Sequence, residues 1–169
     1  LAKLGKVEIL INCAGGSRPL PVDAPEERWV EAMTLNFTRV RQLTHALLPS
    51  MEKNGWGRIV NITGKSEPEG LNAAFSAKAA VHAYTRCLAD ELRGYNVYAN
   101  VVAPGSIITP RFEATRPIDF AQKVEGGTLS RYGWPIELAK AVAFMVSDDA
   151  WFSRGQGLTV DGERQVCAL

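Results

Sequence analysis

The sequence predicts an α/β fold in which a parallel sheet is covered by helices on both faces. Short β-branched runs without polar alternation recur along the chain, and a stretch with helical apolar spacing follows most of them. Parallel strands are buried on both faces and need helical crossovers, so this alternation is typical of an open α/β sheet. The 169 residues, 46% of them hydrophobic, predict a single domain over 1–169.

The first part of the chain predicts one strand and one long helix. The strand is Val7–Asn12, and Cys13–Gly16 after it forms a small-residue turn where a backbone can approach a ligand closely. A helix with acids in its first turn is expected over Glu26–Lys53. Asn36 lies in the middle of this helix, where an amide is a poor helix former and requires a specific reason.

The middle of the chain predicts a strand, a charged loop and a second helix. The strand is Arg58–Thr63, the loop is Gly64–Gly70, and the helix begins near Ala73. Ligands bind at the carboxyl ends of the strands in open α/β sheets, so Thr63 and the first helical turns should line a pocket. Lys78 lies in these turns, either as a pocket residue or as a solvated surface lysine.

The last part predicts two more strands around a long segment and a helix. Val97–Ala103 is a strand that ends at the turn Pro104-Gly105, and Gly157–Val160 is the final strand. Between them, Ser106–Gly133 is expected to be a lid or a partly helical excursion at the ligand edge, because long loops in compact domains are usually functional. Pro135 then opens a helix.

Composition limits the possible partners. The net charge is +1 and basic residues are scattered, which argues against nucleic acid. The chain contains no apolar run of about 20 residues, so we expect no membrane span and a cytoplasmic location. Cys13, Cys87 and Cys167 are far apart and predict free thiols. Neither the cysteines nor His45 and His82 have metal-ligand spacing, so no metal site is expected.

Five motifs occur in the order found in the short-chain dehydrogenase/reductase family, and the resemblance covers nearly the whole chain. The turn Asn12–Gly15 is similar to the family's N-N-A-G turn, and Asn36 matches the asparagine of its catalytic tetrad. The strand ending at Thr63 resembles the one that ends at the catalytic serine, and Lys78 matches the lysine of Y-x-x-x-K. The segment Asn100–Gly105, together with Thr109, is similar to N-x-x-x-P-G-x-x-x-T. The closing run from Gly133 to Gly162 resembles the family's carboxyl-terminal signature.

The resemblance implies a Rossmann-like doubly wound parallel sheet, NAD or NADP as cofactor, and a small carbonyl or alcohol substrate. The catalytic residues implied by the family are Asn36, Thr63 and Lys78. The cofactor-binding residues implied by the family are Asn12, Ala14, Gly15, Lys78, Pro104, Gly105, Ile107 and Thr109.

Two departures from the family stand out. The glycine-rich phosphate turn and the first three strands would precede Leu1, so we expect this chain to hold the C-terminal portion of the fold, incomplete at the N-terminus. Ala74 occupies the position of the tyrosine that exchanges a proton with the substrate oxygen. Losing a positioned general acid costs ~10²–10⁴-fold in rate. Lys65, Ser66 and Glu67 are candidate replacements.

Three functions remain open from the sequence. The leading one is an NAD(P)-dependent oxidoreductase with an atypical proton donor. The second is a dinucleotide-binding protein without catalysis, acting as a sensor or subunit. The third is a lyase or dehydratase on the same fold that uses Lys65 or Glu67 as acid or base. Fold alone does not decide between these functions.

The two longest predicted helices also suggest a homodimer or homotetramer, because in the family they pair across a two-fold axis. Apolar residues on a second face of each helix favour this assembly. These residues are Trp29, Val40 and Leu48 on the first helix, and Val81 and Cys87 on the second.

Overall fold

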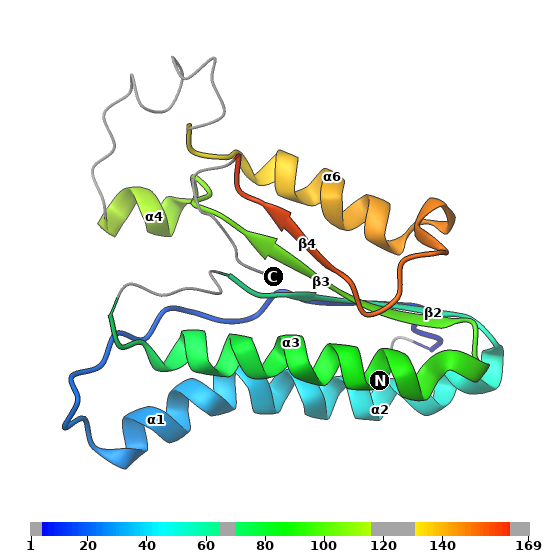
Figure 1. The fold of residues 1–169 in the computed structure, drawn as a ribbon, viewed down its shortest axis with the longest axis horizontal. Helices are drawn as coiled ribbons and strands as arrows, with labels where there is room; N and C mark the ends of the chain where they lie inside the picture. The colour runs from blue at the N-terminus through cyan, green and yellow to red at the C-terminus, as the bar shows by residue number, and fades with distance from the viewer. Residues whose placement is uncertain (1–4, 65–69, 116–130, 163–169) are drawn as a thin grey trace.

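Four parallel strands form one sheet in chain order (Figure 1). The computed structural model describes residues 5–64, 70–115 and 131–162. The strands are β1 (Ile9–Asn12), β2 (Gly57–Ile62), β3 (Val97–Pro104) and β4 (Gly157–Val160). Each strand is hydrogen-bonded to its neighbour in parallel, with Ile9 opposite Arg58 and Gly57 opposite Val97. The predicted α/β parallel sheet is confirmed.

Helices cover both faces of this sheet (Figure 1). The helical elements are α1 (Glu26–Met33), a π-helical turn (Thr34–Thr38), α2 (Arg39–Asn54), α3 (Ala73–Glu91), a 3₁₀ turn (Leu92–Gly94), α4 (Pro110–Thr115), α6 (Pro135–Val146) and a 3₁₀ turn (Asp148–Ala150). Helices α2 and α3 lie on one face, and α6 lies on the other. Within the described part of the chain, no helix is long and apolar enough to cross a membrane.

The core has one half on each side of the sheet. The half under α2 and α3 contains the buried residues Leu10, Leu47, Met51, Ile59, Leu88, Leu92, Val97 and Ala99. The half under α6 contains Val60, Ile62, Val102 and Met145. All six residues of β2 are buried, because this strand has a neighbour on each side and helices above and below.

Strand β1 departs from its prediction. It is shorter than Val7–Asn12, and one of its faces is partly exposed although its residues read as those of a strand buried on both faces, since Ile9 and Ile11 are 43% and 45% exposed. The reason is its place in the sheet. It is the edge strand of the described sheet, and α6 packs over β2, β3 and β4 rather than over β1. Only the face toward α2, which carries Leu10, is covered.

The helix predicted over Glu26–Lys53 is interrupted near its middle. A π-helical turn separates α1 from α2, and the Arg39 N–H donates to the carbonyl of Thr34, five residues back. Asn36 lies in this turn and is fully buried. The Asn36 amide donates to the carbonyl of Ala32 at 2.9 Å. π turns widen a helix locally and frequently occur at functional sites. The π turn therefore explains why an asparagine stands in the middle of this helix.

The residues proposed to line an oligomer interface do not share an exposed face. Val40 and Val81 are 3% and 0% exposed, so the assignment of these two to a second face is wrong. Both pack inside this chain, because α2 and α3 lie side by side (Figure 1). Trp29 and Leu48 are half-buried, and Cys87 is exposed. The homo-oligomer therefore stays a prediction from the family resemblance.

A buried polar network connects the sheet to both long helices. Asn12 on β1 donates to Asn61 Oδ1 on β2 at 2.8 Å and to Thr44 Oγ1 on α2 at 3.3 Å. Asn61 donates to Thr85 Oγ1 on α3 at 2.9 Å. The two threonine hydroxyls donate to carbonyls four residues back in their own helices. Paired in this way, the buried amides fix the register between β1 and β2.

Replacing Asn61 by alanine tests this network. Asn61→Ala leaves polar groups of Asn12 and Thr85 buried with fewer partners, so the free energy of unfolding should fall by ~1–3 kcal/mol. Urea unfolding followed by circular dichroism measures the change. Asn54→Ala is the matched control, since its side chain is exposed at the end of α2. Equal losses in the two variants would show that the network adds no stability.

Candidate functional site

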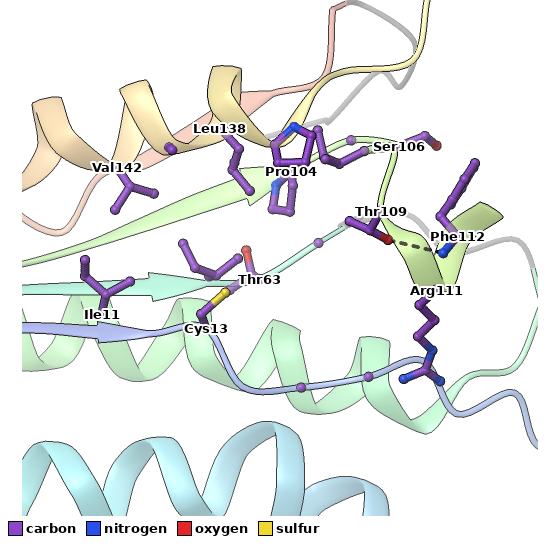
Figure 2. Close-up of a pocket in the computed structure, with 18 of the residues that line it drawn as sticks. Ile11, Cys13, Thr63, Pro104, Ser106, Thr109, Arg111, Phe112, Leu138 and Val142 are labelled. Carbon is purple, nitrogen blue, oxygen red and sulfur yellow. Dashed lines mark hydrogen bonds between the residues drawn. The ribbon is translucent and has the colours of Figure 1, made fainter. Parts of the chain in front are cut away.

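A pocket of about 1000 Å³ opens at the carboxyl edge of the sheet (Figure 2). One wall is apolar and comes from α6, through Leu138 and Val142. The segments that follow β1, β2 and β3 form much of the rest, and they contribute Cys13, Thr63 and Ser106. The predicted position of the pocket, beyond Thr63 and against the start of α3, agrees with this geometry.

Lys78 is buried at the inner end of this site, which excludes the alternative of a solvated surface lysine. Lys78 Nζ donates to the carbonyl of Ile62 at 2.7 Å and to that of Ala14 at 3.4 Å. Burial lowers the pKa of Lys78, because desolvation disfavours the ammonium, and the nearby Cys13 partly opposes this effect. The lysine therefore connects the end of β2 to the turn after β1.

Asn36 holds the same turn from the other side. Its Oδ1 accepts from the N–H of Gly16 at 2.9 Å, and its Nδ2 donates to the carbonyl of Gly16 at 3.3 Å. Gly15 lies between the two side chains. A Cβ at this position would stand 2.8 Å from Asn36 Oδ1 and 3.0 Å from Lys78 Nζ. The small-residue turn is thus required by packing inside this chain as well as by access for a ligand.

Asn72 positions the start of α3, and the sequence analysis missed it. Its Oδ1 accepts from the N–H of Ala74 at 3.0 Å and from that of Arg18 at 3.0 Å. Its Nδ2 donates to Ser17 Oγ at 2.8 Å. An asparagine immediately before a helical run is a strong N-cap signal, which could have identified it. Through these bonds Asn72 fixes the loop after β1 against the first turn of α3.

A smaller cavity of about 230 Å³ lies in front of Lys78. It is lined by Cys13, Asn36, Thr63, Ala74 and Lys78, among others. Ala74 is one helical turn before Lys78, so the space follows from a methyl group where the family has a phenol. Thr63 Oγ1 is buried and has no hydrogen-bond partner among the described residues. An unpaired buried hydroxyl is costly, so it is a feature that a ligand would satisfy.

The segment after β3 forms the opposite wall. Pro104, Gly105, Ile107 and Thr109 all line the large pocket. A Cβ on Gly105 would lie 2.6 Å from Asp161 Cβ, so only glycine lets this turn pack on the segment after β4. Thr109 Oγ1 accepts from the Phe112 N–H at 3.2 Å (Figure 2), which caps α4.

The remaining predicted site residues are placed differently. The Asn12 side chain belongs to the buried network, outside the pocket lining. Ala14 contributes its carbonyl to Lys78. Lys65, Ser66 and Glu67 lie outside the described residues, as does Cys167. Cys13 and Arg111 also line the pocket, although neither is among the catalytic or cofactor-binding residues that the family implies.

The cysteines and histidines form no metal site in the part of the chain that the structure describes, where no group of three or more potential ligands gathers. Cys13 and Cys87 are free thiols, as predicted. His45 is exposed and His82 is half-buried, each on a helix.

Comparison with known proteins identifies the family. A family model described as "Enoyl-(Acyl carrier protein) reductase" matches residues 1–162. A solved structure titled "short chain dehydrogenase/reductase family protein" is 30% identical and covers 95% of this chain and 68% of its own, with a TM-score of 0.83. The chain belongs to the short-chain dehydrogenase/reductase family. In this short-chain dehydrogenase/reductase, Ala74 stands four residues before Lys78, at the position of the tyrosine in the family's Y-x-x-x-K motif.

A curated relative and a solved structure that are both named 7α-hydroxysteroid dehydrogenase are similar to this short-chain dehydrogenase/reductase. The enzyme of Escherichia coli K12 is 37% identical over 166 residues, which cover 96% of this chain and 65% of the relative. A solved structure of 7α-hydroxysteroid dehydrogenase complexed with NADH and 7-oxo glycochenodeoxycholic acid is 36% identical. It covers 99% of this chain and 67% of its own, with a TM-score of 0.80. The chain thus spans somewhat less than two thirds of the Escherichia coli relative.

Gly15→Ala tests the convergence of Asn36 and Lys78. The added Cβ would force both side chains to shift, and such overpacking costs ~1–3 kcal/mol. The midpoint of urea unfolding should fall accordingly. Gly64→Ala is the matched control at the edge of the same pocket, since a Cβ there meets no described atom within 4 Å. If both variants unfold at the same urea concentration, the close approach at Gly15 is not a constraint.

Proposed function

We propose that this chain is part of an NAD(P)-dependent oxidoreductase that acts on a carbonyl or alcohol substrate with an atypical proton donor. The observation that carries the proposal is the convergence of Thr63, Lys78 and Gly15 on one pocket at the carboxyl edge of a parallel sheet. Dinucleotides bind at this edge in open α/β folds. The relative solved with NADH and a 7-oxo bile acid supports the same assignment.

The residues around the pocket suit a dinucleotide. The glycine turn at Gly15 and Gly16 offers backbone that a ligand can approach closely, and the Thr63 hydroxyl, which has no partner among the described residues, offers a polar contact. We assign cofactor contacts to Ala14, Gly15, Lys78, Pro104, Gly105, Ile107 and Thr109, with Asn12 supporting the turn from beneath. When bound, the nicotinamide supplies or accepts a hydride.

Two side chains would then act on the substrate and the ribose, and a third supports them. Lys78 would hold the ribose through its Nζ, which the carbonyls of Ile62 and Ala14 already orient. Thr63 donates its hydroxyl hydrogen to the substrate oxygen. Asn36 keeps the turn before Lys78 in place through Gly16. Proton transfer is the weak step, because Ala74 carries no ionisable group. Lys65, Ser66 and Glu67 stay candidates for that role.

The absence of the tyrosine also favours a second function. A dinucleotide-binding protein that serves as a sensor or subunit would keep Lys78 and the glycine turn and would not need an acid at position 74. A dehydratase or lyase that uses Lys65 or Glu67 is the third. Binding of reduced dinucleotide without turnover on carbonyl compounds distinguishes the second function from the first.

A cytoplasmic location and a homodimer or homotetramer remain proposals that follow from the family.

Lys78→Ala tests the cofactor site. Removing the buried amine should weaken dinucleotide binding at least several-fold, because the ribose hydroxyls lose their hydrogen-bond partner in the pocket. Titration of the complete protein with NADH and NADPH, followed by fluorescence quenching, measures the affinity. Lys140→Ala, on the exposed face of α6, is the control and should bind as the unmodified protein does. An unchanged affinity in Lys78→Ala would remove the lysine from the cofactor site.

Ala74→Tyr tests whether the chemistry is lost or displaced. The cavity beside Ala74 has room for added atoms, and a tyrosine there lies one turn from Lys78. If the loop 64–70 supplies no acid, carbonyl reduction should rise by an order of magnitude or more. Initial rates of NADH or NADPH oxidation with a carbonyl panel, including a 7-oxo bile acid, measure this. Ala79→Tyr, on the exposed side of α3, is the control.

The opposite outcome also has a clear meaning. A fall in the existing activity of Ala74→Tyr would place another acid in this space, and Lys65→Ala and Glu67→Gln would then identify it. If none of these three variants changes the rate, position 74 and the loop are not at the chemical centre, and the assigned site is wrong.

A further inference from the structure

Lys78 has a buried amine beside an open cavity, and the proposed hydride transfer does not require that combination. Its amine lies at the wall of a cavity, and the alanine at position 74 leaves that cavity open. We propose that Lys78 is a nucleophilic amine that forms an imine with small aliphatic aldehydes and ketones in the cavity beside Ala74, without any dinucleotide. This activity goes beyond the proposed oxidoreductase, since it is a covalent, non-redox capture of a carbonyl compound.

The contacts of the amine leave its lone pair available. A neutral primary amine has two N–H bonds and one lone pair. Lys78 Nζ has two hydrogen-bond acceptors, the carbonyls of Ile62 at 2.7 Å and Ala14 at 3.4 Å. Both N–H bonds can therefore be satisfied by backbone, and the lone pair is left for the cavity that Lys78 lines. Among the described residues no carboxylate forms an ion pair with Lys78, so no fixed anion holds it as an ammonium.

Burial also favours the neutral form. Desolvation lowers the pKa of Lys78, and the opposing influence comes from Cys13, which lines the same cavity. A desolvated lysine with a lowered pKa is a recognised way to activate an amine toward carbonyl carbon. The lysines on the surface, such as Lys53 and Lys140, are exposed and lack this desolvation.

The size and lining of the cavity select the carbonyl compound. Its volume of about 230 Å³ holds several water molecules, and hence a small organic molecule, but it is below the range typical of drug-sized ligands. Ile62, Ala74 and Phe75 give it apolar surface, while Thr63 contributes a buried hydroxyl without a described partner. These features fit a short alkyl ketone or aldehyde whose oxygen accepts a hydrogen bond from Thr63.

The reaction balances within these groups. The lone pair on Lys78 Nζ attacks the carbonyl carbon, and the π electrons move to the oxygen, which accepts a hydrogen bond from the Thr63 hydroxyl. One proton passes from the new ammonium to that oxygen, giving a carbinolamine. The remaining N–H proton passes to the hydroxyl oxygen as the C–O bond breaks, so one water molecule is released and a C=N bond forms. No oxidant or reductant is consumed.

Reductive trapping tests the imine. The protein is incubated near neutral pH with 2-butanone and sodium cyanoborohydride in the absence of dinucleotide, and intact-mass and peptide mass spectrometry follow the product. We expect one alkyl group per chain, located on Lys78, at a rate at least tenfold above that of any other lysine. A hemithioacetal on Cys13 is not fixed by this reagent, so the product reports an amine. Labelling spread evenly over exposed lysines, or none at Lys78, overturns the proposal.

Two variants separate the cavity from the amine. Lys78→Arg removes the nucleophile and should abolish the labelling at this position. Ala74→Leu keeps the lysine and fills the space before it, so labelling of Lys78 should fall at least tenfold while the folded circular dichroism spectrum is retained. Lys140→Arg is the control and should label Lys78 normally. If Ala74→Leu is labelled as fast as the unmodified protein, the cavity plays no part and the proposal is wrong.

The experiment is independent of the oxidoreductase assignment. It contains no NADH or NADPH, so a protein that fails to bind dinucleotide can still form the adduct. Conversely, dinucleotide-dependent reduction without adduct formation would remove the imine chemistry and leave the proposed function intact.

Discussion

Lys78 and Asn36 can meet at the pocket only because position 15 carries no side chain. One residue comes from α3 and the other from the π turn after α1, and a Cβ on Gly15 would approach both to about 3 Å. Asn36 fixes the backbone of Gly16, while Lys78 fixes the carbonyls of Ala14 and Ile62. The inner end of the site is thus held by two side chains that bind backbone groups. Its shape depends on the close approach of both side chains to the backbone of Gly15.

The sequence predicted the strands, the pocket edge and several of its residues because these depend on local patterns. Buried strands such as β2 read as continuous apolar runs, and the carboxyl end of such a strand locates the pocket in any open α/β sheet. Thr63 and Lys78 followed from this rule together with the family motifs. The helix starting near Ala73 also agrees with the structure, because small residues follow an N-cap asparagine at Asn72.

Long-range contacts account for what the sequence could not give. A helical period shows that Val40 and Val81 are apolar, but only the packing of α2 beside α3 shows that they are buried inside this chain. The family motif predicted Asn12 as a cofactor contact, whereas its side-chain amide donates to Asn61 and Thr44 in the buried network. The half-exposed β1 depends on which elements lie beside it, and a strand's own residues carry no such information.

The π turn at Thr34–Thr38 makes this site sensitive to the number of residues in the helix as well as to their identity. A π turn accommodates more residues than the α-helical turn it replaces. Removing one residue here would let a regular α-helix form while α1 and α2 keep roughly their present faces, because the wide turn is what absorbs the extra residue. Helix α1 would then still present Ala32 to Ala73. The wide turn itself carries Asn36 and its hydrogen bonds to the backbone of Gly16 and Ala32, and these bonds would be lost. A one-residue deletion can therefore leave the packing of the helices in place and still disturb the pocket.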